Sequence, residues 1–251
     1  MHKIKHECGV FGLFGIEEAS VLTTLGLHSL QHRGQEGAGI VSSNDGSFYS
    51  IRKEGLVGDN FNDADTLSKL PGKHAIGHVR YSTTGDSKLE NIQPFFANLA
   101  TGGFACAHNG NLTNTIGLKK ELVSTGSIFR TTSDTEVILQ LVARSPKSTV
   151  VEKLSDALSK IEGAYSLVIL TDDQLIGVKD PFGIRPLVLG RKDGGYVLAS
   201  ETCALDIIGA TYVRDIENGE MVVISGSGIE SIQLSNLHDE RPCIFERIYF
   251  A

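Results

Sequence analysis

The residue best suited to catalysis in this 251-residue chain is Cys8, which follows the short segment 1–7. If that segment is removed, Cys8 becomes the first residue and carries a thiol beside its own α-amine. A free α-amine titrates near pH ~8 and a thiol near ~8.5, so the amine can take the thiol proton around neutrality. Cys8 is therefore a candidate nucleophile, on condition that residues 1–7 are removed. Taken alone, Cys8 is better explained as a small buried apolar side chain, and only the rest of the chain favours a nucleophile.

A second group of polar residues could complete a binding site around such a nucleophile. Arginine fits a carboxylate, an aspartate suits an ammonium group, and an amide NH₂ with a glycine N–H can stabilise an oxyanion. Together these groups match a free amino acid that carries a side-chain amide. Individually, each has an ordinary role on a surface, in a hairpin turn or in the first turn of a helix. The group consists of Arg33, Arg80, Thr83, Asn109, Gly110 and Asp134.

The composition excludes several classes of function. Hydrophobic residues make up 41% and charged residues 21%, which is typical of a globular domain. The net charge is −7 and no basic block is present, so we expect no nucleic-acid partner. No apolar run is long enough to cross a membrane, and 1–7 lacks the apolar core of a secretory signal. The 4 cysteines are widely spaced, which favours a reducing, cytoplasmic location over a disulfide framework.

Hydrophobic patterning indicates many short strands and fewer helices. Strands are predicted over 10–14, 40–42, 48–53, 75–81, 104–108, 165–170 and 175–179, with further strands over 187–190, 196–200, 221–224 and 229–234. Helices are predicted over 17–30 and 112–125, and after two capping boxes, Ser133 with Glu136 and Thr149 with Glu152. Because the strands come in hairpins and the helices partly in pairs, we expect an α+β fold with mainly antiparallel sheets covered by helices.

Five motifs, in their order along the chain, resemble those of class II glutamine amidotransferases. Each motif is weak alone, but the five in order are specific together, and the resemblance covers essentially the whole chain. The resemblance implies an N-terminal-nucleophile hydrolase with a four-layer αββα sandwich. The motifs are residues 8–12 (CGVFG), 31–35 (QHRGQ), 78–83 (HVRYST), 108–112 (HNGNL) and 132–136 (TSDTE).

The resemblance also implies a reaction. Cys8 would attack the side-chain amide of glutamine, release ammonia and form a thioester, which water would hydrolyse to glutamate. The Asn109 side chain and the Gly110 N–H would form the oxyanion hole. The α-amine of Cys8 would serve as base and then as acid.

The same resemblance assigns the substrate-binding residues. Arg80 would hold the glutamine carboxylate and Asp134 the ammonium group, with Thr83 assisting. Arg33 would stabilise the loop over the site.

Two motifs point to a subgroup whose members continue into a phosphoribosyltransferase domain, namely 31–35 and 179–187 (KDPFGIRPL). We therefore expect a propeptide over 1–7, a glutaminase domain over 8–251, and a C-terminal transferase domain absent from this chain. In the complete protein, ammonia would convert phosphoribosyl pyrophosphate into 5-phosphoribosylamine, the first step of de novo purine biosynthesis. The resemblance further implies Mg²⁺ in that domain and a homo-oligomer, a tetramer.

Cys243 lies in the sequence PCIFE, residues 242–246. In the subgroup this context implies one ligand of a [4Fe–4S] cluster. Because a cluster needs several thiolates, we expect no cofactor in this chain alone.

Two alternatives remain open from the sequence. The chain could be the glutaminase half of another class II amidotransferase, such as glucosamine-6-phosphate synthase, although the motifs at 31–35 and 179–187 argue against that. It could also be an unprocessed, inactive precursor in which 1–7 blocks the α-amine, leaving only a binding module.

Overall fold

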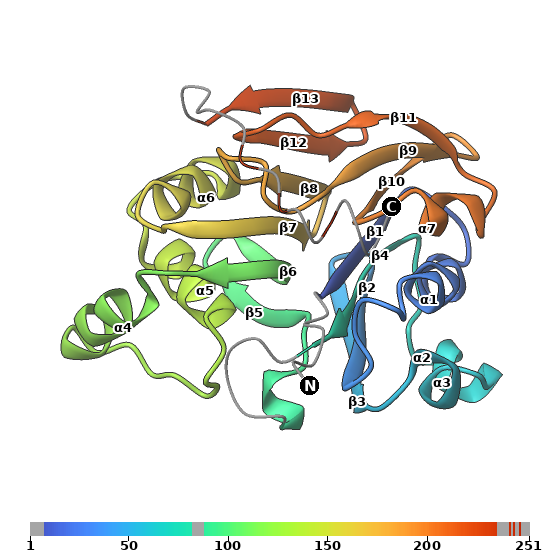
Figure 1. Ribbon diagram of the computed structural model, residues 1–251, viewed down its shortest axis with the longest axis horizontal. Coiled ribbons are helices and arrows are strands. Elements are labelled where there is room, and N and C mark those ends of the chain that lie inside the picture. The colour runs from blue at the N-terminus through green and yellow to red at the C-terminus, as the bar shows by residue number, and fades with distance from the viewer. Residues whose placement is uncertain (1–7, 82–87, 235–240, 242, 244–245, 247–251) are drawn as a thin grey trace.

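The computed structural model describes residues 8–81, 88–234, 241, 243 and 246, which form two packed sheets with helices on both outer faces (Figure 1). Thr83 and the propeptide predicted over 1–7 lie outside the described residues.

The first sheet has seven strands, and every neighbouring pair is antiparallel. In sheet order they are β11 (Thr211–Asp215), β9 (Val188–Lys192), β10 (Gly195–Ala199), β1 (Gly9–Phe14), β4 (His74–Arg80), β2 (Gly37–Asn44) and β3 (Ser47–Glu54). Its outer face is covered by α1 (Ala19–Ser29), α2 (Val57–Asn60), α3 (Ala64–Ser68) and α7 (Cys203–Asp206). All six residues of β1 are buried, because this strand lies in the middle of the sheet.

The second sheet has six antiparallel strands. In sheet order they are β13 (Gly228–Gln233), β12 (Glu220–Ser225), β8 (Gln174–Lys179), β7 (Gly163–Thr171), β6 (Gly102–Leu112) and β5 (Phe95–Leu99). Helices α5 (Thr135–Arg144) and α6 (Val150–Leu158) pack on it through one apolar core, with α4 (Thr115–Ser124) beside them and a short 3₁₀ helix, η1 (Leu89–Asn91), before β5. Within the described ranges, no helix has the length and apolar character needed to cross a membrane.

A third apolar cluster fills the space between the two sheets. Val10 and Ile76 of the first sheet pack there against Ala105 and Val168 of the second. The approach is so close that a Cβ on Gly12 would lie 2.6 Å from a methyl carbon of Val168. Helix, sheet, sheet and helix therefore form four layers, which confirms the predicted α+β sandwich.

The structure corrects two local predictions. The strand expected to end at residue 108 continues as β6 to Leu112, because its backbone keeps pairing with β7 as far as Gly163. The capping box at Ser133 is wrong, since Asp134 takes the cap position and the Glu136 carboxylate instead accepts the N–H groups of Arg130 and Thr131. The capping box of Thr149 and Glu152 is confirmed.

Candidate active site

Cys8 lies at the start of β1, directly beside the end of β4. The pairing of Gly9 with Val79 brings the Cys8 sulfur within 3.4 Å of both the backbone nitrogen and the carbonyl oxygen of Tyr81. Ser200 fixes the same strand from the other side, because its hydroxyl accepts the Val10 N–H at 2.9 Å. Cys8 is therefore held at the start of the central strand β1 and is 8% exposed.

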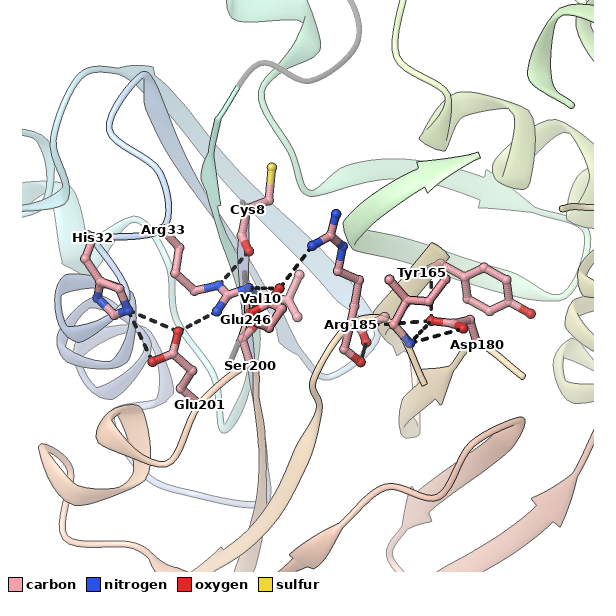
Figure 2. A network of polar contacts seen from close by, with 12 residues as sticks. Cys8, Val10, His32, Arg33, Tyr165, Asp180, Arg185, Ser200, Glu201 and Glu246 are labelled. Atoms are coloured by element: carbon pink, nitrogen blue, oxygen red, sulfur yellow. Dashed lines mark hydrogen bonds and ion pairs between the residues drawn. The ribbon is translucent and has the colours of Figure 1, made fainter. Parts of the chain in front are cut away.

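Arg33 lies beneath Cys8 and is completely buried. Its Nε donates to the carbonyl oxygen of Cys8 at 2.9 Å, and its two terminal nitrogens donate to Glu201 and to Glu246 (Figure 2). Burial lowers the pKa of Arg33, but the two carboxylates outweigh that effect and raise it overall. The structure thus gives Arg33 a contact with the backbone of Cys8, while its predicted role in substrate binding stays a prediction.

His32 extends this network toward the surface. Its Nε2 lies 3.0 Å from Oε1 of Glu201, and this hydrogen bond is the largest cause of a raised His32 pKa. Burial alone would raise the pKa of Glu201, but the neighbouring His32 and Arg33 lower it below its ordinary value. Glu201 is therefore a shared, ionised acceptor for both side chains.

Arg80 is the last residue of β4, one residue before the predicted strand end at 81, and it is 5% exposed. Its Nε lies 4.0 Å from a carboxylate oxygen of Glu36, and Gly37 of β2 pairs with it. Gly34 packs directly on the Arg80 backbone, so a Cβ at that position would lie 2.6 Å from the Arg80 carbonyl oxygen. The motif at 31–35 thus supports both Cys8, through Arg33, and Arg80.

Asn109 and Gly110 lie within β6. Asn109 is fully buried, and neither its Nδ2 nor its Oδ1 has a hydrogen-bond partner among the described residues. An unsatisfied buried amide is costly and calls for an explanation such as a ligand group. At Gly110, φ is +152° and a Cβ would lie 2.0 Å from the Ala164 carbonyl oxygen, so only glycine fits.

A hydrogen bond between the two sheets brings Asn109 near the end of β4. Nε2 of His78, on β4, lies 3.1 Å from the carbonyl oxygen of His108, on β6. Burial, together with the charge of Arg80, lowers the pKa of His78 to about 3. The imidazole is therefore neutral at pH 7 and donates from Nε2 to that carbonyl. His78 is two residues before Arg80, and His108 directly precedes Asn109. The hydrogen bond therefore places Arg80 and Asn109 at the same end of the sandwich.

Asp134 joins the same edge from the start of α5. Its Oδ2 accepts the Leu112 N–H of β6 at 2.8 Å, and its Oδ1 lies 3.7 Å from Nδ1 of His108. Burial lowers the pKa of His108, although the Asp134 carboxylate opposes that effect. Asp134 therefore anchors the end of β6, and its predicted contact with a substrate ammonium group stays a prediction.

Cys243 is a half-buried free thiol. Within the described part of the chain, no three His, Cys, Asp or Glu side chains are grouped closely enough to hold a metal ion. These residues do not by themselves fit an iron–sulfur cluster, and Cys243 as one ligand of such a cluster stays a prediction.

Sequence reasoning missed three charged residues in the ion-pair network of Arg33, which are Glu201, Glu246 and Arg185. Glu201 gives no local signal, because it follows β10 in an ordinary turn. Arg185 and Glu246 lie inside motifs that the sequence shows, but nothing in those motifs reveals that Nη1 of Arg185 donates to Oε1 of Glu246 at 3.2 Å.

Comparison with known proteins shows which family the chain resembles. The family model described as "Glutamine amidotransferase domain" matches residues 78–206, about half of the chain. The amidophosphoribosyltransferase of Rhizobium etli is 51% identical over 253 residues, and the chloroplastic amidophosphoribosyltransferase of Vigna aconitifolia is 55% identical over 250 residues. Each alignment covers 99% of this chain but 51% of the relative, so the chain spans about half the length of these relatives.

A solved structure agrees with both the fold and the family. The glutamine phosphoribosylpyrophosphate amidotransferase of B. subtilis, complexed with ADP and GMP, superposes with a TM-score of 0.92 at 46% identity. The superposition covers 97% of this chain and 53% of that one. On the family model and these similarities, the chain belongs to the glutamine amidotransferase domain family.

Proposed function

We propose that this chain hydrolyses glutamine to glutamate and ammonia through a thioester on Cys8. The observation that carries the proposal is the Asn109 side chain, which is fully buried and without a partner among the described residues. It lies at the end of the sandwich where the strands that carry Cys8 and Arg80 also begin or end. A hydrogen-bond donor held ready for an oxygen that becomes negative is what amide hydrolysis requires.

The proposed reaction has two steps. The Cys8 sulfur attacks the side-chain amide carbon of glutamine, and the resulting oxyanion is stabilised by the Asn109 amide and the Gly110 N–H. The amide nitrogen takes a proton and leaves as ammonia, so that a thioester remains. Water then attacks the thioester, releases glutamate and restores the thiol.

The proton carrier in this scheme is the α-amine of Cys8, which requires cleavage of the peptide bond between Glu7 and Cys8. Around neutrality the amine can accept the thiol proton and later pass it to the leaving nitrogen. Arg80 and Asp134 would orient glutamine through its carboxylate and ammonium groups, with Thr83 assisting.

For the complete protein we propose the activity named in its relatives. The ammonia would pass to phosphoribosyl pyrophosphate, giving 5-phosphoribosylamine for purine biosynthesis, on a transferase domain that would use Mg²⁺. Cys243 would supply one ligand of a [4Fe–4S] cluster whose other ligands come from that domain. The complete protein would act in the cytoplasm as a homo-oligomer, a tetramer.

The first test is an intact mass spectrum before and after exposure to 6-diazo-5-oxo-norleucine, an electrophilic analogue of glutamine. We expect loss of residues 1–7 and one adduct, which peptide mapping places on Cys8 and which Cys8→Ser abolishes. A full-length mass without an adduct would instead support the inactive precursor. A processed chain that stays unlabelled would contradict the proposed role of Cys8.

A further inference from the structure

Glu246 receives two arginines on a single carboxylate oxygen. Its Oε1 accepts from Nη2 of Arg33 at 2.7 Å and from Nη1 of Arg185 at 3.2 Å (Figure 2). The three side chains are 9%, 0% and 10% exposed, so the pairing takes place almost entirely out of water. Hydrogen bonds between ionised groups in such surroundings are strong and directional.

One of these arginines, Arg33, also contacts the backbone of the proposed nucleophile, Cys8. Besides Glu246, Arg33 holds the carbonyl oxygen of Cys8 through its Nε at 2.9 Å. Glu246 is therefore connected to the backbone of Cys8, beside the first sheet, through the planar guanidinium group of Arg33.

The other arginine, Arg185, is hydrogen-bonded to the second sheet. The carbonyl oxygen of Arg185 accepts the hydroxyl of Ser166 at 2.9 Å, and Ser166 of β7 is the register partner of Asn109 in β6. The turn that carries Arg185 is held by the buried Asp180, whose carboxylate accepts the N–H groups of Phe182 and Ile184. Glu246 is therefore also connected, through Arg185, to the paired strands β6 and β7, of which β6 carries the proposed oxyanion hole.

We infer that Glu246 is a positioning residue, which holds Cys8 on the first sheet and Asn109 on the second at their working separation. The inference rests on the proposed function, since it concerns the alignment of the attacking sulfur with the oxyanion hole. Removing the Glu246 charge leaves two buried guanidinium groups beside one another with one fewer anion, and they move apart. A misplacement of about 1 Å between reacting groups can cost on the order of 100-fold in rate.

The test compares Glu246→Gln, made in the complete natural protein, with a matched control, Glu220→Gln. Glu220 is also a buried carboxylate paired with an arginine, Arg214, at 2.7 Å and 2.8 Å, but it lies on β12 away from Cys8. We expect Glu246→Gln to lower kcat for glutamine hydrolysis by about tenfold or more, with a much smaller change in KM. We expect Glu220→Gln to lower the melting temperature with kcat unchanged.

A second readout separates alignment from general damage. Iodoacetamide alkylates the Cys8 sulfur without using an oxyanion hole, so Glu246→Gln should slow its reaction far less than it slows turnover of glutamine. In a protein that already carries Arg33→Lys, Glu246→Gln should lower kcat little further, because both substitutions break the same connection between Glu246 and Cys8. If Glu246→Gln does not fold, Glu246→Asp, which keeps the charge but shortens the reach, is measured instead and should also lower kcat.

The possible results are distinct. A Glu246 variant that loses stability as Glu220→Gln does, while kcat stays at the unsubstituted value, would overturn the inference and leave the proposed function intact. A lowered kcat with full additivity to Arg33→Lys would overturn the linkage through Arg33. An unsubstituted protein that neither hydrolyses glutamine nor reacts at Cys8 would overturn the proposed function and the inference together.

Discussion

At the scale of single residues, Gly110 has almost no freedom to change. Its φ of +152° is strained for any residue with a side chain, and the nearest backbone oxygen would lie 2.0 Å from an added Cβ. Since that oxygen belongs to the paired strand β7, it cannot move without disturbing the sheet.

We therefore expect Gly110→Ala to lower the free energy of unfolding by about 2 kcal/mol or more and to abolish glutamine hydrolysis. Gly117→Ala is the matched control, because that glycine lies in α4 and an added Cβ meets no atom within 4 Å. The control should be neutral or stabilise the chain by about 0.5–1 kcal/mol. Urea unfolding of both variants gives the comparison, and equal stabilities would refute the steric argument.

At the scale of elements, the start of α6 depends on a local hydrogen-bond pair. The Thr149 hydroxyl accepts the Glu152 N–H at 3.2 Å, and the Glu152 carboxylate accepts the Thr149 N–H at 3.0 Å. Helix α6 packs Leu154 and Leu158 into the core over the second sheet, so a frayed first turn weakens that layer.

Replacing Thr149 by alanine should cost about 1 kcal/mol of folding stability without changing glutamine turnover, because α6 lies on the outer face of the sheet. Ser148→Ala, one residue earlier and outside the capping pair, should leave stability within about 0.5 kcal/mol of the unsubstituted chain. Thermal unfolding and a glutaminase assay on both variants would check this, and equal losses in the two would argue against the capping pair.

At the scale of the whole molecule, the two sheets are joined by apolar packing and by the His78 hydrogen bond to the His108 carbonyl. The pKa of His78 is lowered to about 3, chiefly by burial. Between that value and the ordinary value of about 6.5, the unfolded chain binds a proton that the folded chain does not. The stability linked to His78 is thus present above pH 6.5 and is lost as the pH falls toward 3.

The unsubstituted chain should accordingly lose about 2 kcal/mol more stability between pH 7 and pH 5 than His78→Gln does, whose amide can still donate to the His108 carbonyl. Urea unfolding at the two pH values measures this difference. His32→Gln is the control with the opposite sign, because the pKa of His32 is raised and its contribution is lost as the pH rises. Parallel pH profiles for His78→Gln and the unsubstituted chain would contradict the assignment.

The sequence by itself determined most of the helices and strands and the residues proposed to carry out the chemistry. Alternating and periodic hydrophobic residues predicted most strands and helices, because each side chain's burial depends on which face of a local element it occupies. The motifs predicted Cys8, Arg80, Asn109, Gly110 and Asp134, and the structure brings these residues to one edge of the sandwich.

Only the tertiary structure decided how these residues are held. The Glu246 carboxylate meets Arg33 across 213 positions of the chain, and Glu201 meets it across 168, so no local pattern could reveal either contact. The continuation of β6 through Asn109 likewise depends on pairing with β7, since Asn-Gly in isolation favours a turn. Local propensity acts over a few residues, whereas burial and ion pairing act between whichever segments the fold brings together.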